Sequence, residues 1–247
     1  MHRTPPSPIV NHSRPSLIPK KNQWGQNMLH FIYASDLPRH PLLEDTMFRD
    51  RACQFKSRLN WDVTVNAQGH ERDEYDDLNP LYLIAAAPDG RHLGSMRFMP
   101  TTGRTMINDH FTHLIGGGTL ESPFIWECTR FCLAKGAPSR VAAALTLGGG
   151  EIMRQCGIEH FVGVFDARMV RIYSRIGWPP EVLGSAGDGR DRISVGLWSR
   201  GLEDRIRIAA QAGITPAQVE DWYNSGVNAR PASPQTDFSR NDFSGAV

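Results

Sequence analysis

The chain has 247 residues, of which 40% are hydrophobic, and it carries a formal net charge of +1. This composition supports one folded domain with a full hydrophobic core. The near-neutral charge does not indicate a nucleic-acid partner, and no apolar run reaches the roughly 18 residues of a membrane span. Because residues 1–23 lack the apolar region of a signal peptide, we expect a cytoplasmic protein.

The four cysteines do not indicate a metal or disulfide site. Cys53, Cys128, Cys132 and Cys156 form no CxxC pair, and no histidine lies at zinc-finger spacing from them. Cys128 and Cys132 fall in a predicted strand, where two residues on one face do not complete a ligand set. We therefore expect free thiols and no metal.

The chain divides into one domain and two tails. Residues 1–26, rich in Pro and Ser, are expected to be disordered, and the polar residues 226–247 to form a flexible tail. Within residues 27–225, apolar periodicity and turn signals predict strands at Leu29–Ala34, Leu81–Ala87, Leu93–Met99, Phe124–Leu133, Phe161–Phe165, Val182–Leu183 and Ile193–Trp198. Helices are predicted at Leu42–Leu59, Val141–Cys156, Ala167–Ile176 and near 202–212 and 216–223.

This order of elements indicates a mixed α/β (α+β) fold built on one sheet. Asp89-Gly90 is a strong hairpin turn between two of the strands, and Gly157 and Gly177 end two of the helices. Helices, a run of antiparallel strands, and then a strand–helix–strand unit are typical of a sheet covered by helices. A split in such a sheet would suit a thioester, but periodicity does not locate one.

Four sequence blocks combine arginine with carboxylates or aromatic rings. They are Arg51–Trp61, Glu71–Asp77, Gly94–Thr101 and Trp126–Phe131. Taken singly, each has a structural explanation: amphipathic packing, a solvated acidic loop, or a structural ion pair. However, Arg97, Glu127 and Arg130 fall inside strands that otherwise read as core, where a charge is unfavourable unless it is paired or used. Strand alternation predicts that Glu127 and Thr129 share one face and that Arg130 lies on the other.

In this order and spacing, the blocks resemble the acyl-homoserine-lactone synthases, the LuxI-type autoinducer synthases, from about Met47 to Trp198. The invariant positions of that family fall on Arg51, Phe55, Trp61, Asp73, Asp76, Arg97, Glu127 and Arg130, and Thr129 stands where the family has Ser or Thr. The resemblance implies a single domain with a GNAT-like mixed sheet, splayed at its middle and flanked by helices. It also implies an enzyme without a prosthetic group that N-acylates S-adenosylmethionine from an acyl-ACP thioester, or from acyl-CoA, and then closes the lactone with release of methylthioadenosine.

The implied chemistry assigns roles to these residues. The α-ammonium of S-adenosylmethionine is not nucleophilic, so a base must remove its proton, and Glu127 is the candidate. Alternatively, Glu127 only orients Arg130 or Arg97, and a strand carbonyl with an ordered water takes the proton. Asp73 and Asp76 supply charge for the sulfonium, and Phe55 or Trp61 a π face, unless these two rings only pack in the core. Arg51 or Arg97 is the candidate fork for the substrate carboxylate.

The acyl chain and its carrier require two further sites. Candidate residues for an acyl pocket, which could equally be ordinary core, are Phe98, Met99, Phe124, Leu145, Met153, Phe161, Gly163, Val164 and Phe165. Gly163 stands where family members that prefer 3-oxo chains often carry Thr, which favours an unsubstituted or 3-hydroxy chain. Arg168, Arg171 and Arg175 form a basic stripe on one predicted helix, either a docking site for the acidic acyl carrier protein or a solvated face.

Two rival functions remain. A GNAT-type N-acyltransferase using acyl-CoA would need a glycine-rich turn after the central strand to cradle the pyrophosphate, and only Gly136 lies between Leu133 and Leu147. A catalytically silent binding protein would not need the charges of Arg97, Glu127 and Arg130 inside strands.

Overall fold

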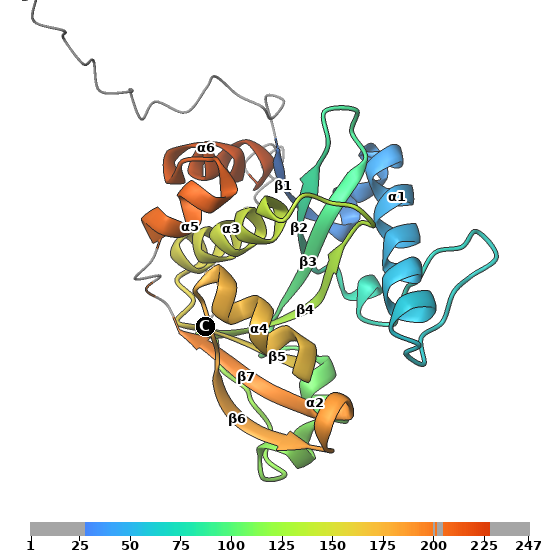
Figure 1. The fold of residues 1–247 in the computed structure, drawn as a ribbon, viewed down its shortest axis with the longest axis vertical. Coiled ribbons are helices and arrows are strands. Elements are labelled where there is room, and N and C mark those ends of the chain that lie inside the picture. The colour runs from blue at the N-terminus through green and yellow to red at the C-terminus, as the bar shows by residue number, and fades with distance from the viewer. Residues whose placement is uncertain (1–27, 200, 202–204, 228–247) are drawn as a thin grey trace, which may run out of the picture.

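The computed structural model describes residues 28–199, 201 and 205–227, so both predicted tails lie outside the described residues except for Gly226 and Val227. A seven-stranded sheet runs through the molecule in the order β1-β2-β3-β4-β5-β7-β6 (Figure 1). The strands are β1 Leu29–Tyr33, β2 Leu81–Ala86, β3 His92–Pro100, β4 Ile125–Leu133, β5 His160–Asp166, β6 Glu181–Ala186 and β7 Ile193–Ser199. Neighbouring strands are antiparallel except β4 and β5, which are parallel.

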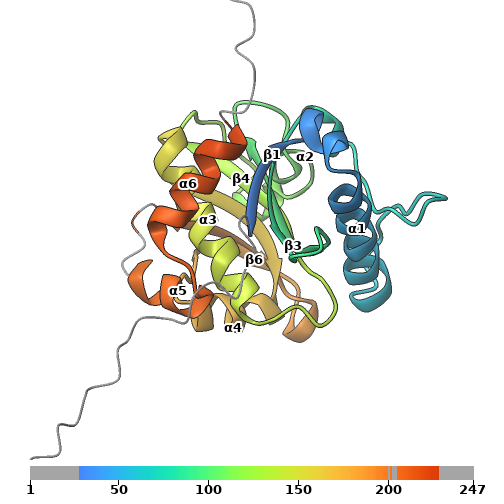
Figure 2. The same cartoon turned by 90° about the horizontal axis from the view of Figure 1, so that it is seen from above.

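Helices cover both faces of this sheet. The α-helices are α1 Pro41–Ala52, α2 Met106–His110, α3 Arg140–Cys156, α4 Ala167–Ile176, α5 Arg205–Ala212 and α6 Pro216–Val227, and the short 3-10 or π segments are η1 Ala34–Arg39, η2 Cys53–Arg58, η3 Asp76–Leu78, η4 Thr112–Ile115 and η5 Gly189–Asp191. Figure 2 shows α1 on one side of the sheet and α3, α5 and α6 on the other. The expected fold class, a mixed sheet flanked by helices, is confirmed.

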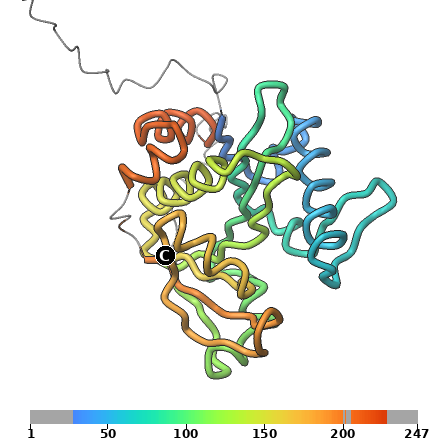
Figure 3. Tube along the Cα trace, viewed as in Figure 1, coloured from blue at the N-terminus to red at the C-terminus, as the bar shows by residue number. Residues whose placement is uncertain are grey.

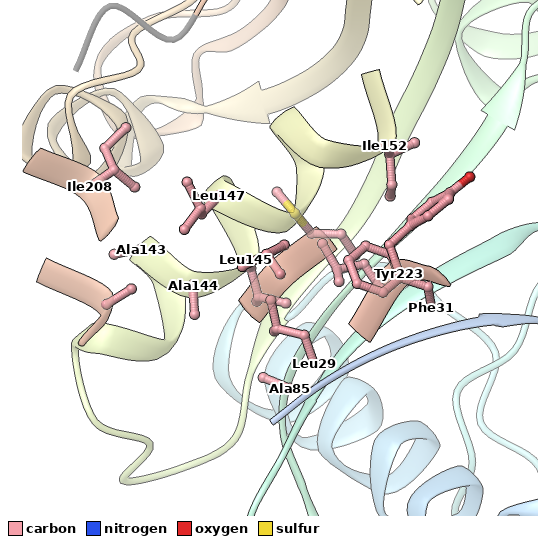
Figure 4. Packing of buried hydrophobic residues seen from close by; sticks show 14 of the residues in the cluster. Leu29, Phe31, Ala85, Ala143, Ala144, Leu145, Leu147, Ile152, Ile208 and Tyr223 are labelled. Atoms are coloured by element: carbon pink, nitrogen blue, oxygen red, sulfur yellow. The ribbon is translucent and has the colours of Figure 1, made fainter. Parts of the chain in front are cut away.

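Strand alternation explains the two layers. In β1 and β2, Phe31 and Leu83 pack in the core beneath α3, whereas Ile32 and Ile84 pack in a separate cluster beneath α1. The α3 side holds the larger core, where the apolar face of α3 meets β1, β2, α5 and α6 (Figure 4). None of the helices in the described part of the chain combines the length and the apolar character that a membrane span requires.

The sheet splits between its two parallel strands. β4 and β5 pair only at Ile125–His160, Trp126–Phe161 and Glu127–Val162. Beyond these positions β4 continues along β3 to Leu133, whereas β5 continues along β7 to Asp166. The sheet is therefore open in its middle, in the GNAT-like manner that the resemblance to the autoinducer synthases implied.

Three local features differ from the sequence prediction. The helix expected over Leu42–Leu59 ends at Ala52 and continues as the π-helical turn η2, and Figure 3 shows the chain leaving it in a long loop before β2. The short helix α2 was not predicted. The final helix continues to Val227, two residues past the expected boundary at 225, and Gly226 lies close to the backbone of Phe31 in β1.

Candidate active site

A cavity of about 800 Å³ passes through the split in the sheet. On the α1 side its wall includes Asp73, Thr129 and Arg130, and on the α3 side it includes Phe98 and Phe161. The volume lies within the range of roughly 300–1,000 Å³ that is usual for small-molecule sites. One continuous cavity thus has a charged end and an apolar end.

Arg51 and Glu71 form the buried base of the charged end. Arg51 Nε donates to Glu71 Oε2 at 2.6 Å, and its two terminal nitrogens donate to Asp76 at 3.0 and 2.9 Å. Arg51 is 1% exposed and the side chains of Glu71 and Asp76 are 0% exposed, so each charge depends on its partners. Tyr82 adds a hydrogen bond of 2.6 Å to Asp76.

Arg97 and Arg130 extend this network to the cavity. Arg97 binds Asp73 through both terminal nitrogens, donates to Asp76 at 2.7 Å, and donates from Nε to Thr129 Oγ1 at 3.0 Å. Arg130 Nη2 lies 2.6 Å from Asp73 and 3.0 Å from Glu71. Three arginines therefore meet three carboxylates, and the formal charges cancel.

The ionised forms of Asp73 and Asp76 are favoured in this network. Although burial raises the pKa of Asp73 and Asp76, the neighbouring guanidinium groups of Arg97, Arg130 and Arg51 outweigh it and hold both pKa values below the usual range. Asp73 and Arg130 keep 13% and 11% of their side chains exposed and line the cavity. Arg51, Asp76 and Arg97 lie behind them and do not line the cavity. The position of Arg51 and Arg97 therefore does not favour the expectation that one of them binds a substrate carboxylate.

A bulge in β4 aims Arg130 at this network. The register with β3 advances by two residues, from Ser95 to Arg97, while β4 advances by three, from Cys132 to Thr129. Arg130 takes a left-handed φ of 53° at this point. Its side chain and that of Thr129 therefore meet the same group of residues, and the prediction that Arg130 lies on the opposite face is wrong.

Two aromatic rings close the charged end. Phe55 on η2 stacks on Trp61 with the ring centroids 5.2 Å apart and the planes 6° from parallel. Arg130 Cζ lies 5.5 Å from the Phe55 ring centroid. Both rings line the cavity, and Trp61 is 37% exposed, so these rings do more than pack in a core.

Glu127 does not line the cavity. Its oxygens accept hydrogen bonds from the backbone nitrogens of Met106 at 3.1 Å and Ile107 at 2.6 Å, at the start of α2. Burial raises its pKa to about 7 in spite of these two donors and of the nearby Arg97 and Arg130. Glu127 therefore holds α2, and through it Met106, against the cavity, and the prediction that it contacts the substrate as a base is not supported by its position.

The apolar end divides the predicted acyl residues into two groups. Those that line the cavity are Phe98, Phe161, Gly163, Val164 and Phe165. Those that do not are Met99, Phe124, Leu145 and Met153. Leu145 and Met153 are buried in the core beneath α3, Met99 is buried beside Glu127, and Phe124 is 52% exposed just before β4. These four residues lie outside this cavity, because periodicity marks a residue as apolar but does not show which apolar space it fills.

Gly163 lies where the backbones of the split strands approach each other closely. A Cβ at this position would lie 2.6 Å from the carbonyl oxygen of Cys128. The glycine therefore allows close backbone approach at the point where β4 and β5 separate, in addition to leaving this wall without a hydroxyl.

The predicted basic stripe is exposed on α4. Arg168, Arg171 and Arg175 are all exposed, and Arg168 is anchored by Asp166, the N-cap of the helix, at 2.6 Å. Arg168 also lines the cavity, whereas Arg171 and Arg175 form no ion pair with a described residue. The stripe therefore begins at the rim of the apolar end.

Sequence reasoning missed several residues of this site. Glu71 belongs to the acidic block, but the sequence does not distinguish it from a solvated loop residue. Its role is visible only in the structure, where it forms an isolated β-bridge with Val65 and ion pairs with Arg51 and Arg130. Further cavity residues to which the sequence assigned no role in the site include Met96, Thr146, Tyr173 and Trp198. Within the described residues, no group of His, Cys, Asp and Glu side chains is arranged to hold a metal ion.

Comparison with known proteins decides the family. The model of the autoinducer synthase family matches residues 36–196. The acyl-homoserine-lactone synthase of Rhizobium etli is 41% identical over 189 residues, which cover 71% of this chain and 89% of that protein. The chain belongs to the autoinducer synthase family. It is accordingly an acyltransferase of the acyl-homoserine-lactone synthase class.

Other relatives of this autoinducer synthase agree. The acyl-homoserine-lactone synthase of Agrobacterium fabrum is 39% identical over 147 residues, 56% of this chain and 69% of that protein. The solved structure of the synthase LasI is 25% identical, with a TM-score of 0.63 over 76% of this chain and 95% of that one. The CoA-dependent synthase BjaI, solved with SAM and isopentyl-CoA, shares the fold with a TM-score of 0.67 at 22% identity, over 76% of this chain and 90% of that one.

Proposed function

We propose that the cavity binds S-adenosylmethionine at its charged end and an acyl thioester at its apolar end, and that it joins them into an acyl-homoserine lactone. The observation that carries the proposal is the continuity of the cavity through the split between β4 and β5. Substrates that enter from opposite faces of the sheet meet at Cys128 and Gly163, where the strands separate. Such an arrangement converts a bimolecular acyl transfer into a reaction between neighbours.

The charged end suits a sulfonium amino acid. The exposed edge of Asp73 offers negative charge, and the stacked pair Phe55 and Trp61 offers π faces to a cation or a purine. Arg130 is the arginine of the network that lines the cavity, so we assign to it the recognition of the substrate carboxylate. Arg51, Arg97, Asp76 and Thr129 are positioning residues in this proposal.

The reaction then proceeds in two steps. The α-amine loses a proton and attacks the thioester carbonyl, and the collapse of the tetrahedral intermediate forms the amide and expels a thiolate, which takes up a proton. The carboxylate oxygen then attacks the γ-carbon, the bond from this carbon to the sulfonium breaks, and methylthioadenosine leaves as a neutral thioether. One proton is released overall.

We assign the first proton transfer to a water held at the carbonyl of Cys128. This carbonyl points at Gly163 in the split, whereas both oxygens of Glu127 are occupied by backbone donors. Asp73 is a weak base because its neighbours lower its pKa. Glu127 contributes by holding α2 and the side chain of Met106 at the cavity wall.

We further propose an acyl carrier protein as the donor, docked on the stripe of Arg168, Arg171 and Arg175. An acidic carrier would complement this exposed stripe, which begins at the rim of the apolar end. The connection from β4 to α3, residues 134–139, contains a single glycine, Gly136, and so lacks the glycine-rich turn that would cradle a CoA pyrophosphate.

The test is to incubate the purified chain with S-adenosylmethionine and either acyl carrier protein or CoA thioesters, and to quantify products by mass spectrometry. We expect equal amounts of acyl-homoserine lactone and methylthioadenosine, with a higher kcat/KM for the carrier-protein donor. An acylated amine without methylthioadenosine would instead identify an N-acyltransferase, and no product would refute the proposal.

A matched pair of variants ties that activity to the cavity. Asp73→Asn removes the charge at the cavity edge and is expected to raise KM for S-adenosylmethionine. Asp77→Asn changes a side chain that is 82% exposed and is expected to leave KM unchanged. Equal KM values in the two variants would contradict the assignment of Asp73.

A further inference from the structure

The middle of α3 contains three consecutive glycines, Gly148, Gly149 and Gly150. Glycine in a helix interior is unfavourable relative to alanine, so each position calls for a physical reason. Gly148 has one in the packing of the helix on the sheet. A Cβ there would lie 2.8 Å from Leu83 Cδ2 and 3.3 Å from Leu29 Cδ1, closer than side chains tolerate.

Gly149 has no such reason in the protein itself. A Cβ there would lie 3.6 Å from the Phe161 ring and 3.8 Å from the rings of Phe98 and Trp178, which is ordinary van der Waals contact. The backbone of α3 at Gly149 therefore accepts an alanine without displacement of its neighbours. Protein packing therefore does not require the absence of a side chain at Gly149.

The cavity supplies a reason. Gly149 lines its apolar end together with Thr146, one turn earlier on α3, and with the three rings that surround the missing Cβ. The rings are fixed against one another, with centroid distances of 4.8 Å for Phe98–Phe161 and 6.3 Å for Phe161–Trp178. Since these rings leave room for little more than one carbon, any larger side chain at Gly149 must extend into the space that the cavity occupies.

We infer that Gly149 is a specificity-determining residue that sets the longest acyl chain the enzyme accepts. The inference rests on the proposed function, because it assigns the apolar end to the acyl chain of the thioester. A valine at this position would occupy volume that the distal methylenes of a long chain otherwise fill. Each methylene excluded from the apolar wall would lower kcat/KM by about fourfold, the factor that corresponds to burial of one CH₂ group.

The experiment compares Gly149→Ala, Gly149→Val and the matched control Gly150→Ala in kcat/KM for a series of saturated acyl thioesters from hexanoyl to tetradecanoyl. Gly150 lies in the same helix but does not line the cavity. For Gly149→Val we expect a loss of at least about tenfold for the longest donors that the wild type uses, with hexanoyl transfer within about twofold of wild type. Gly150→Ala is expected to keep the wild-type profile.

Gly149→Ala keeps the inference testable if the valine variant does not fold, because the alanine fits the space between the rings. Gly149→Ala is expected to shift the dependence of kcat/KM on chain length toward shorter chains, by less than Gly149→Val does. Both alanine variants are expected to melt at a higher temperature than the wild type, because alanine favours a helix interior more than glycine does. Unchanged long-to-short ratios in folded Gly149→Ala and Gly149→Val would overturn the inference. A wild type that yields no lactone from any donor would instead overturn the proposed function.

Discussion

Arg130 and Asp73 meet at the wall of the cavity, 2.6 Å apart, although they lie on a central strand and in the loop before β2. The contact depends on the bulge in β4, where Arg130 adopts a φ of 53°. A left-handed conformation is unfavourable for a residue with a Cβ by about 1–2 kcal/mol. The strand therefore carries backbone strain at the residue that presents a guanidinium to the cavity.

Replacement of Arg130 separates the strain from the charge. Arg130→Ala and Arg130→Gly both remove the guanidinium, and we expect each to lower kcat/KM by roughly a hundredfold, since the charge-assisted hydrogen bonds that the guanidinium is proposed to form with the substrate carboxylate are worth about 3 kcal/mol. Only glycine relieves the strain, so Arg130→Gly is expected to be more stable than Arg130→Ala by up to about 1 kcal/mol in denaturant unfolding. Equal stabilities would mean that the left-handed conformation does not persist in solution.

Glu71 is the carboxylate on which two arginines depend. Glu71→Gln leaves Arg51, which is 1% exposed, and Arg130 with one counter-charge fewer, and we expect the free energy of unfolding to fall by about 3 kcal/mol. Glu74→Gln is the control, because this glutamate is 49% exposed and its contact with Arg104 is 3.6 Å long. Its effect on the free energy of unfolding should stay within about 0.5 kcal/mol. A similar loss in both variants would show that the ion pairs of Glu71 contribute no more to stability than those of an exposed glutamate.

The raised pKa of Glu127 predicts a pH dependence of stability. Because the pKa is about 7 in the folded chain and lies near 4.5 when exposed, the folded state binds this proton more tightly than the unfolded state. The corresponding stability is complete below pH 4.5 and is lost as the pH rises through 7. Unfolding free energies measured from pH 5 to 8 should therefore fall more steeply for the wild type than for Glu127→Gln.

The same variant distinguishes a positioning role from a base. If Glu127 only holds α2, Glu127→Gln should reduce kcat/KM moderately while the limb of the pH profile that reports amine deprotonation stays in place. Loss of that limb together with nearly all activity would make Glu127 the base and would contradict the assignment to a water at Cys128.

Charge reversal on α4 tests the donor site. Arg171→Glu places a negative charge in the middle of the exposed stripe, and we expect a higher KM for an acyl carrier protein donor and a weaker dependence of kcat/KM on salt. Arg91→Glu makes the same change in the β2–β3 turn, where the side chain is 64% exposed and serves as the control. If both variants retain the KM of the wild type, the carrier protein docks elsewhere.

The sequence by itself determined the family, the fold class and most of the secondary structure. Apolar residues repeat with the periods of helices and strands, so elements such as α3 and β3 follow from local pattern, and glycines end α3 and α4 where the periodicity stops. The charged residues of four blocks were also visible, because a charge inside an apolar strand contradicts its surroundings. These signals are local, and a sequence displays them directly.

Only the tertiary structure decided which of these residues face the cavity. Alternation placed Arg130 on the wrong face because a bulge in β4 depends on its register with β3. Glu127 is held by hydrogen bonds from the start of α2. Glu71 matters because it pairs with Arg51 and Arg130, which lie 20 and 59 residues away in the chain. Leu145 and Gly149 lie on the same helix, yet one fills the core and the other lines the cavity, because packing between distant elements fixes where space remains.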